Sequence, residues 1–323
     1  MGNKEQKADR LLEIFLLAMK GEQLSVAELS KRYQVSTRSI TRDINEIKSF
    51  LAEHRDTVGS TEMKYSSVTH TYRLELDSFL TNKELLGISK VLIGSRAFGT
   101  EALVAIMAKL KAHTSPDDRE KLEHLIRKEI YHYSPVHADC EDVLENLWRI
   151  TDYIEQKRYI SIDYYKMDRT RSTYRLKPMA VLFTEYYFYM IAFKDTEDDT
   201  PYYFRLDRIV EITAHREYFE IEKDALVDEG LIRQHSQYMF PGKARRIRFS
   251  FSGPSVQAVL DKIPSAKIIA MEDGKYILEA EVFGEGVKMF LLSQGAWVEV
   301  LSPKEFREEI IIEVGKMAGN YLD

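Results

Sequence analysis

The sequence predicts an α+β chain of several domains. Apolar side chains recur at helical spacing in the first part of the chain, short tyrosine-rich strands cluster after residue 158, and residues 243–323 mix strands with helices. A chain of 323 residues has room for two or three domains of roughly 100–200 residues each. The ranges that we infer for domains and linkers are 1–78, 79–140, 141–222, 223–242 and 243–323.

The composition, with 44% hydrophobic and 30% charged residues, is ordinary for a globular protein. No apolar run reaches the roughly 18–20 residues of a membrane span, and the N-terminus lacks a signal-peptide core, so we expect no membrane partner. The one cysteine, Cys140, permits no internal disulfide, which fits a cytoplasmic location. The net charge of −6 argues against nucleic-acid binding by the whole surface, yet residues 31–50 hold five basic and two acidic side chains.

Three short helices are predicted in the first domain, over 8–19, 26–33 and from residue 37 onward. The inward face of the first is expected to hold Leu11, Leu12, Phe15 and Met19. Ser25 with Glu28 is a capping box, and Ser36 can cap the third helix. In that third helix one apolar stripe is formed by Ile40, Ile44, Ile47 and Leu51.

A tight turn between two helices, followed by a polar and basic last helix, is typical of a helix-turn-helix. Its hydroxyls suit phosphates, and its arginines can pair with guanine edges or phosphate. Two short strands, "EMKYS" and "THTYRLEL", follow with a turn near Ser66 and Ser67, and they predict a hairpin, or wing. The alternative is a small helical bundle with a solvated basic face.

The stretch "VSTRSITRDINEI" resembles the winged helix-turn-helix of bacterial transcriptional regulators, whose pattern is V-S-x-R-T-I-x-R-D-I-x-x-L. Ser39 stands for the usual Thr and Ile47 for the usual Leu. The resemblance implies that the following residues face double-stranded DNA: Ser36, Thr37, Arg38, Ser39, Thr41 and Arg42. Lys31 and Arg32 are expected to contact phosphates. Since the Arg42–Asp43–Ile44 triplet partly holds the helix in this pattern, Arg38 is the stronger candidate for reading a base.

Residues 79–140 are expected to form a helical linker that positions the DNA reader, pairs two copies of the chain, or simply packs between domains. Helical periodicity is interrupted at Gly94 and Gly99, and Pro116 begins another helix. A further helix has Val143, Leu147, Ile150 and Ile154 on one face. The tetrapeptide "HADC" at 137–140 has metal-binding residue types but no second pair at ligand spacing, so we expect no metal.

Tyrosine is concentrated in the next domain, where ten of the 19 tyrosines fall within residues 153–203. Five short strands there predict a small closed or half-closed barrel. Residues 201–212, "PYYFRLDRIVEI", read as one strand with Arg205 and Arg208 on opposite faces. Interleaved rings and arginines suit stacked bases and phosphates. Alternatively, the tyrosines form core and rim while the arginines pair with Asp163, Asp207 and Glu211.

This stretch resembles the WYL domain, an SH3-like or Sm-like barrel, in Tyr164, in the R-x-x-P from Arg175 to Pro178, and in "FRLDRI". The Trp-Tyr-Leu triplet that names the family reads Phe188-Tyr189-Met190 here. The resemblance implies a sensor of a nucleotide or single-stranded nucleic acid. The candidate ligand residues are Tyr189, Arg205 and Arg208, followed by Tyr164, Arg171 and Arg175. One arginine of the strand can instead be held by Asp207, and the sequence does not decide which.

Residues 223–242 are expected to be a linker, with "FPGK" at 240–243 as its end, and residues 243–323 read as β, α, a hairpin with Asp273-Gly274 at its turn, α, β and a final helix. This is a ferredoxin-like order. It resembles the C-terminal extension that often follows WYL domains, including "GAWVEVLSP". The "GEG" at 284–286 lacks the context of a phosphate-binding loop.

Together the resemblances imply a ligand-responsive transcription regulator that binds double-stranded DNA and an anionic ligand, forms a homodimer and uses no cofactor. One alternative is an RNA- or protein-binding interaction module with a degenerate helix-turn-helix. The other is an enzyme acting on a nucleotide. We expect no enzyme, because no Ser/His/Asp set, metal cluster or paired acids stand in a catalytic motif.

Overall fold

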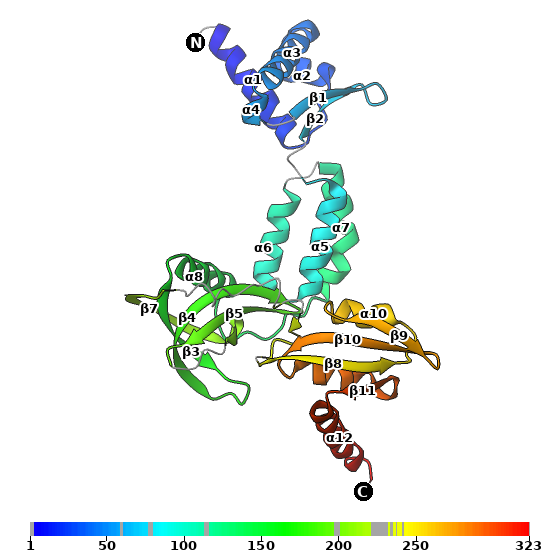
Figure 1. Ribbon diagram of the computed structural model, residues 1–323. Helices are drawn as coiled ribbons and strands as arrows, with labels where there is room; N and C mark the ends of the chain where they lie inside the picture. Colours follow the sequence, from blue (N-terminus) through cyan, green and yellow to red (C-terminus); the bar gives the residue numbers. More distant parts are fainter. Residues whose placement is uncertain are drawn as a thin grey trace. The chain divides into compact units, whose positions relative to one another are not determined.

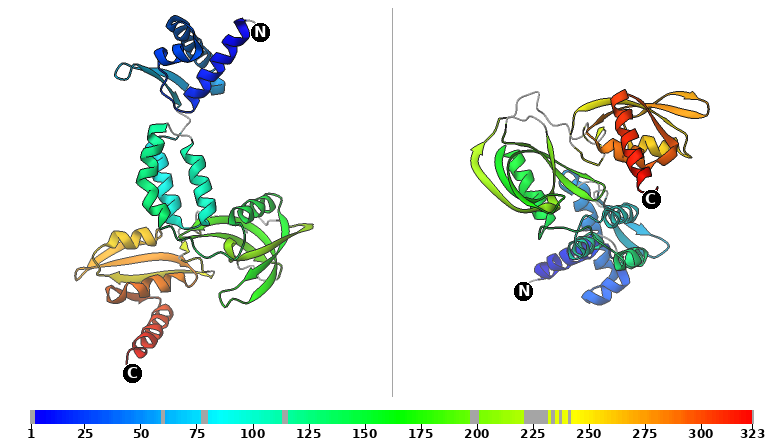
Figure 2. Two further views of the ribbon diagram at one scale, coloured as in Figure 1. Left: turned by 180° about the vertical axis from the view of Figure 1, so that it is seen from behind. Right: turned by 90° about the horizontal axis from the view of Figure 1, so that it is seen from below.

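The computed structural model divides into two compact units, Met1–Val136 and His137–Asp323 (Figure 1). Figure 2 shows two further views of the chain. The residues that the structure describes are 3–58, 61–76, 80–112, 116–196, 201–220, 232, 235–236, 238–240 and 242–322. Within these residues, no helix combines the length and apolar character that crossing a membrane requires.

The first unit begins with four helices, α1 (Asn3–Met19), α2 (Val26–Tyr33), α3 (Thr37–Glu53) and α4 (Arg55–Val58). Both predicted N-caps are confirmed: the Ser25 hydroxyl accepts from the Glu28 N–H, and the Ser36 hydroxyl accepts from the Ser39 N–H at 3.2 Å. The predicted apolar stripe of α3 is also confirmed, because all four of its side chains are buried in one core.

The predicted inward face of α1 is partly wrong. Leu12 and Met19 are 62% and 37% exposed, whereas Ile14 and Ala18 are buried against the core that includes α3. The helix also begins at Asn3 rather than at residue 8. Apolar residues fill most of the second half of α1, so spacing alone does not single out one face. Packing with α3 selects the face that is buried.

The predicted hairpin is confirmed as β1 (Thr61–Ser66) paired antiparallel with β2 (Thr71–Leu76). Leu24, just before α2, exchanges two backbone hydrogen bonds with Tyr72, at 2.8 and 2.9 Å. This bridge ties the hairpin to the helices. The sequence did not reveal it, because a bridge of one residue leaves no alternating pattern.

Three helices complete the first unit: α5 (Asn82–Ser95), α6 (Thr100–Lys111) and α7 (Pro116–Tyr131). They lie side by side (Figure 1). A full capping box of Thr81 and Glu84 begins α5. The break at Gly99 and the start of α7 at Pro116 fall where the sequence predicts them, whereas Gly94 lies inside α5, one residue before its end.

The second unit starts with α8 (Val143–Glu155), which packs on a five-stranded antiparallel sheet (Figure 1). The strands are β3 (Arg158–Tyr165), β4 (Arg171–Thr184), β5 (Tyr187–Lys194), β6 (Tyr202–Arg205) and β7 (Ile209–Tyr218). Their order is β6-β5-β4-β3-β7. Only three residues join β6 and β7 at opposite edges, so the sheet must curl strongly.

The prediction of one continuous strand over 201–212 is wrong. A 3-10 turn, η1 (Leu206–Arg208), separates β6 from β7. The Asn146 amide donates to the carbonyls of Leu206 and Ile209, at 3.3 and 3.0 Å. These carbonyls are therefore taken by a side chain sixty residues away in sequence, which no local alternation can reveal.

The rest of the second unit follows the predicted order of strands and helices. Its elements are β8 (Ala244–Phe251), α10 (Val256–Lys262), β9 (Lys267–Glu272), β10 (Lys275–Phe283), α11 (Gly286–Ser293), η3 (Gly295–Trp297), β11 (Val298–Ser302) and α12 (Lys304–Gly319). The antiparallel sheet has the order β11-β8-β10-β9. Gly274 at the predicted hairpin turn has φ +77°, the left-handed conformation that favours glycine. Phe249 and Phe306 lie at the centre of the core.

Candidate functional sites

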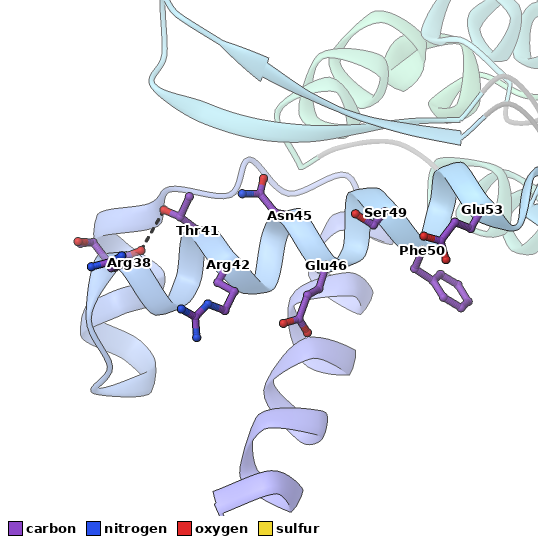
Figure 3. A pocket seen from close by; sticks show the side chains of 9 residues that line it. Arg38, Thr41, Arg42, Asn45, Glu46, Ser49, Phe50 and Glu53 are labelled. Atoms are coloured by element: carbon purple, nitrogen blue, oxygen red, sulfur yellow. Dashed lines mark hydrogen bonds between the residues drawn. The ribbon is translucent and has the colours of Figure 1, made fainter.

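The exposed side of α3 forms a shallow groove along the helix (Figure 3). Its lining residues are Thr37, Arg38, Thr41, Arg42, Asn45, Glu46, Ser49, Phe50 and Glu53. The two arginines lie toward the N-terminal end, and the two glutamates lie farther along the helix. A polyanion is therefore favoured only at the N-terminal part of the groove, where the helix dipole also attracts negative charge.

A buried ion pair fixes α3 against α1. The Arg10 Nε lies 2.7 Å from one Asp43 carboxylate oxygen, and its Nη2 lies 3.3 Å from the other. The Asp43 side chain is 1% exposed and that of Arg10 14% exposed. Within the Arg42–Asp43–Ile44 triplet, Asp43 and Ile44 thus hold the helix while Arg42 points outward.

Arg38 and Arg42 are both exposed, and in the part of the chain that the structure describes neither has an ion-pair partner. The hydroxyls around them are more occupied. Ser36 and Ser39 share a hydrogen bond of 2.9 Å, and the Thr41 hydroxyl donates to the Thr37 carbonyl at 3.0 Å. These hydroxyls keep acceptor lone pairs, but the arginines are the free donors for phosphates or bases.

Of the two expected phosphate contacts in α2, Arg32 forms an ion pair with Glu13 at 2.5 Å. Both side chains are about half exposed, so the pair is worth little and a phosphate can replace the carboxylate. Lys31 is exposed. Asn45 and Ser49 also line the groove, although the sequence did not single them out as site residues. Their spacing from Arg38 and Thr41 along one helix face was the signal that could have found them.

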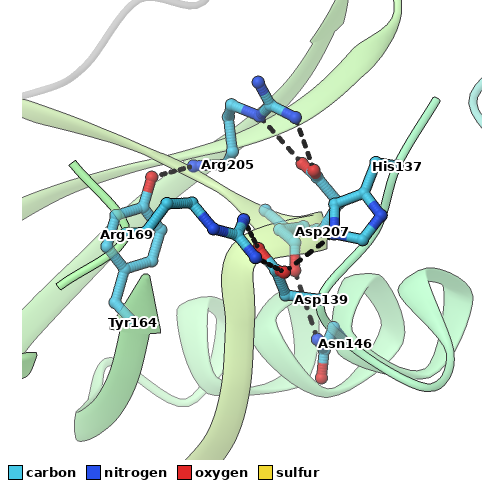
Figure 4. Close-up of polar contacts among 8 residues, drawn as sticks. His137, Asp139, Asn146, Tyr164, Arg169, Arg205 and Asp207 are labelled. Atoms are coloured by element: carbon cyan, nitrogen blue, oxygen red, sulfur yellow. Dashed lines mark hydrogen bonds and ion pairs between the residues drawn. The ribbon is translucent and has the colours of Figure 1, made fainter. Parts of the chain in front are cut away.

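In the second unit, Arg205 is the arginine that Asp207 holds (Figure 4). Its Nε and Nη2 donate to the two Asp207 carboxylate oxygens, at 3.1 and 2.6 Å. Its guanidinium carbon lies 3.3 Å from the centre of the Tyr187 ring. With side chains 17% and 7% exposed, this bidentate pair braces the turn that joins β6 to β7.

Arg208 sits on the same turn and is partly exposed. Within the described residues it has no carboxylate partner. The structure thus distinguishes the two arginines that the sequence left equivalent. Arg205 is braced, and Arg208 keeps its donors available.

Tyr164 and Tyr189 adjoin the braced arginine. The Tyr164 hydroxyl accepts from the Arg205 backbone N–H at 3.3 Å, and burial raises the pKa of Tyr164. Tyr189 lies opposite Arg205 across the β5–β6 pair. Burial raises the pKa of Tyr189 to about 12, so its hydroxyl stays protonated and can donate a hydrogen bond at neutral pH.

Arg171 and Arg175 have their own carboxylates. Arg171 pairs with Asp163 at 2.5 Å, and Arg175 pairs with Asp195 at 2.9 Å and Glu217 at 3.4 Å. The alternative that carboxylates neutralise the arginines of this domain therefore holds for these two residues of β4. Asp163 is a partner as expected, but the others are Asp195 and Glu217 rather than Glu211. Their carboxylate partners differ from Asp207, which holds Arg205.

Residues 137–140 contact η1. In the sequence they stood out only as a weak candidate for metal binding. The backbone N–H groups of Asp139 and Cys140 donate to the Asp207 carbonyl, at 2.7 and 3.1 Å. Burial raises the pKa of Cys140 to about 11, so its thiol is protonated at neutral pH. Among the described residues, no group of His, Cys, Asp and Glu side chains could hold a metal ion.

Comparison with known families identifies two domains in the second unit. Residues 145–214 match the WYL domain, and residues 243–318 match the WCX domain. The chain carries both. No curated protein matches the chain.

Two solved structures resemble the chain distantly. Proteasome accessory factor B/C (PafBC) of Arthrobacter aurescens is 14% identical with a TM-score of 0.29, over 99% of this chain and 49% of that one. This chain therefore spans about half of that protein's length. A structure described as a CRISPR Cas-related protein is 17% identical with a TM-score of 0.38, over 77% of this chain and 76% of that one.

Proposed function

We propose that this chain is a ligand-responsive transcription regulator. Residues 3–76 act as a winged helix-turn-helix that binds operator DNA, and the WYL domain binds an anionic ligand, a nucleotide or a short single strand. The WYL and WCX domains support the regulator class. Because a sensor needs no bond-making groups, we propose no catalytic activity.

The observation that carries DNA binding is the pair of exposed arginines on α3. Arg38 and Arg42 are one helical turn apart, so both can reach one groove of a duplex. Arg38 precedes Arg42 on a helix whose position the buried Arg10–Asp43 pair fixes. A pre-positioned arginine can donate to guanine O6 and N7 together, a contact worth about 1–3 kcal/mol of discrimination.

For ligand binding, Arg208 is the leading candidate because its guanidinium has no carboxylate to displace among the described residues. Its planar fork suits a phosphate. Tyr189, which lies opposite Arg205 across the β5–β6 pair, is the candidate to donate its hydroxyl hydrogen to the same ligand. We propose lesser roles for Tyr164, Arg171 and Arg175, since each is buried or ion-paired.

We further propose a homodimer that reads two half-sites, since one such reading helix contacts few bases. On α12, Ile311, Ile312, Val314 and Met317 are each about half exposed, and all but Ile312 line a groove against α11 and β11, which we propose as one surface where two copies meet. Light scattering of the full chain should give about twice the 37.7 kDa of one chain. A mass of one chain, with and without DNA, would rule the dimer out.

The DNA proposal is tested by selecting duplexes from a random library and measuring their affinity for the full chain at two salt concentrations. Arg38→Ala and Arg42→Ala should each weaken the selected duplex at least tenfold, since each removes one charged contact. Arg55→Ala removes an exposed arginine outside α3 and is the matched control. If Arg38→Ala and Arg42→Ala bind like the wild type, as Arg55→Ala should, α3 does not read DNA. Preference for RNA over the selected duplex would instead favour an interaction module.

A further inference from the structure

The segment His137–Cys140, the first of the second unit, has no role in the function proposed so far. It nevertheless makes several contacts to the turn that carries the candidate ligand arginine (Figure 4). Both the Asp139 and Cys140 N–H groups converge on the carbonyl of Asp207. A carbonyl oxygen has two lone pairs, so these two donors saturate it.

The Asp139 side chain connects this segment to a third part of the domain. Its two oxygens accept from Arg169 Nη1 and Nη2, at 3.0 and 2.8 Å, and one of them lies 3.0 Å from His137 Nε2. Arg169 lies in the turn between β3 and β4, with φ +66°, and its guanidinium lies 5.3 Å from the Tyr165 ring centre. The Asp139 side chain is itself only 7% exposed. Asp139 therefore joins the leading segment, the β3–β4 turn and η1.

Two further carbonyls, one in η1 and one at the start of β7, are held by α8. Asn146, on the first turn of α8, takes those of Leu206 and Ile209. The backbone of η1 is thus bonded to residues that precede the sheet, whereas the Arg205 side chain is held by Asp207. Any anion that draws Arg205 away from Asp207 removes the side-chain contact that holds η1 to β6.

We infer that Asp139 is a positioning residue. It fixes η1 in the conformation that presents Arg208 to an anion. Through the same contacts, residues 137–140 stay ordered only while η1 keeps that conformation. This inference rests on the proposed ligand site, and it adds the route by which occupancy of that site reaches the first residues of the second unit. Such coupling is reciprocal. A change that loosens η1 also loosens residues 137–140, and a change that loosens residues 137–140 lowers the affinity for the anion.

The first test needs no ligand. In hydrogen exchange of the full chain, Asp207→Asn weakens the Arg205 brace and should speed exchange of the Asp139 and Cys140 amides at least about fivefold, the factor for one net hydrogen bond. Arg205→Lys keeps a positive charge and should act in the same direction but less. Peptides from β3 and β4 must exchange as in the wild type, which shows that the domain is folded. Unchanged exchange at residues 139 and 140 while η1 exchanges faster would overturn the inference.

The second test measures binding of a 5′-phosphorylated thymidine pentanucleotide to the full chain. Asp139→Asn should weaken binding about tenfold or more, and Arg169→Gln should do the same, with no further loss in the double variant. Asp142→Asn is the matched control: Asp142 caps α8 through the N–H groups of Leu144 and Glu145, and Asn caps equally well. If Asp139→Asn binds like the wild type, the positioning role is wrong. If the wild type binds no pentanucleotide, the ligand part of the proposed function fails, and hydrogen exchange alone decides the inference.

Discussion

Removal of Arg10 is expected to destabilise the first unit strongly, because Arg10 is the ion-pair partner of the buried Asp43. Arg10→Ala removes the ion-pair partner of the Asp43 carboxylate, whose side chain is 1% exposed in the wild type. Breaking a buried ion pair in this way costs about 3–5 kcal/mol. The same change at Arg32, whose pair with Glu13 is about half exposed, costs about 0–1 kcal/mol.

Hydrogen exchange followed by mass spectrometry on the full chain can measure both changes locally. Peptides within α3 report the free energy of opening of that helix. A loss of about 3 kcal/mol lowers their protection roughly a hundredfold, because every 1.4 kcal/mol is about tenfold. Arg32→Ala, measured on the same peptides, should stay within about fivefold of the wild type.

A third variant tests whether the loss in Arg10→Ala comes from the unpaired charge of Asp43 or from lost packing. Arg10→Met combined with Asp43→Leu replaces the pair by apolar side chains of similar length, which is often neutral or stabilising by about 1–4 kcal/mol. The double variant should therefore recover most of the protection that Arg10→Ala loses. If Arg10→Ala and Arg32→Ala give equal protection in α3, the pair does not fix the helix and the reasoning fails.

Three further outcomes follow from single residues of the second unit. Burial raises the pKa of Tyr189 to about 12, so its contribution to stability is present below pH about 10 and is lost as pH rises toward 12. Over that pH range the free energy of unfolding should therefore fall less for Tyr189→Phe than for the wild type. Burial alone would raise the pKa of Asp139, but hydrogen bonds from Arg169 and His137 outweigh it and lower that pKa. The contribution of Asp139 to stability is therefore present above pH about 3.9 and is lost as pH falls through the lowered pKa. Below pH about 3.9 the free energy of unfolding should fall less steeply for Asp139→Asn than for the wild type. Gly253→Ala would place a Cβ 2.4 Å from the buried Phe251 ring, so we expect about 1–3 kcal/mol of destabilisation and altered fluorescence of the adjacent Trp297.

The parts of the fold that local spacing determines were predictable from the sequence. The stripe of α3 and the Ser36 cap depend on residues three or four positions apart, and both are present. The inward face of α1 was not predictable in this way, since apolar residues occupy several faces of that helix. A partner helix decides such a case, and its position is a tertiary property.

The candidate sites likewise include features that local sequence predicts and features that depend on tertiary contacts. Composition and spacing indicated Arg38 and Arg42, and both are exposed where a duplex could reach them. The difference between Arg205 and Arg208 depends on η1, whose carbonyls are held by Asn146 and by the N–H groups of Asp139 and Cys140. These donors lie some sixty residues earlier in the chain, so the strand pattern around Arg205 carried no sign of them.

The most direct test of DNA reading by α3 is the base preference of Arg38→Ala at every position of the selected duplex. If Arg38 reads a base, the variant should lose about 1–3 kcal/mol of discrimination at one guanine and keep the preferences elsewhere. Arg55→Ala should keep the whole preference profile. An Arg38→Ala profile identical to that of the wild type, at the same salt concentration, would contradict the assignment of α3 as the reading helix.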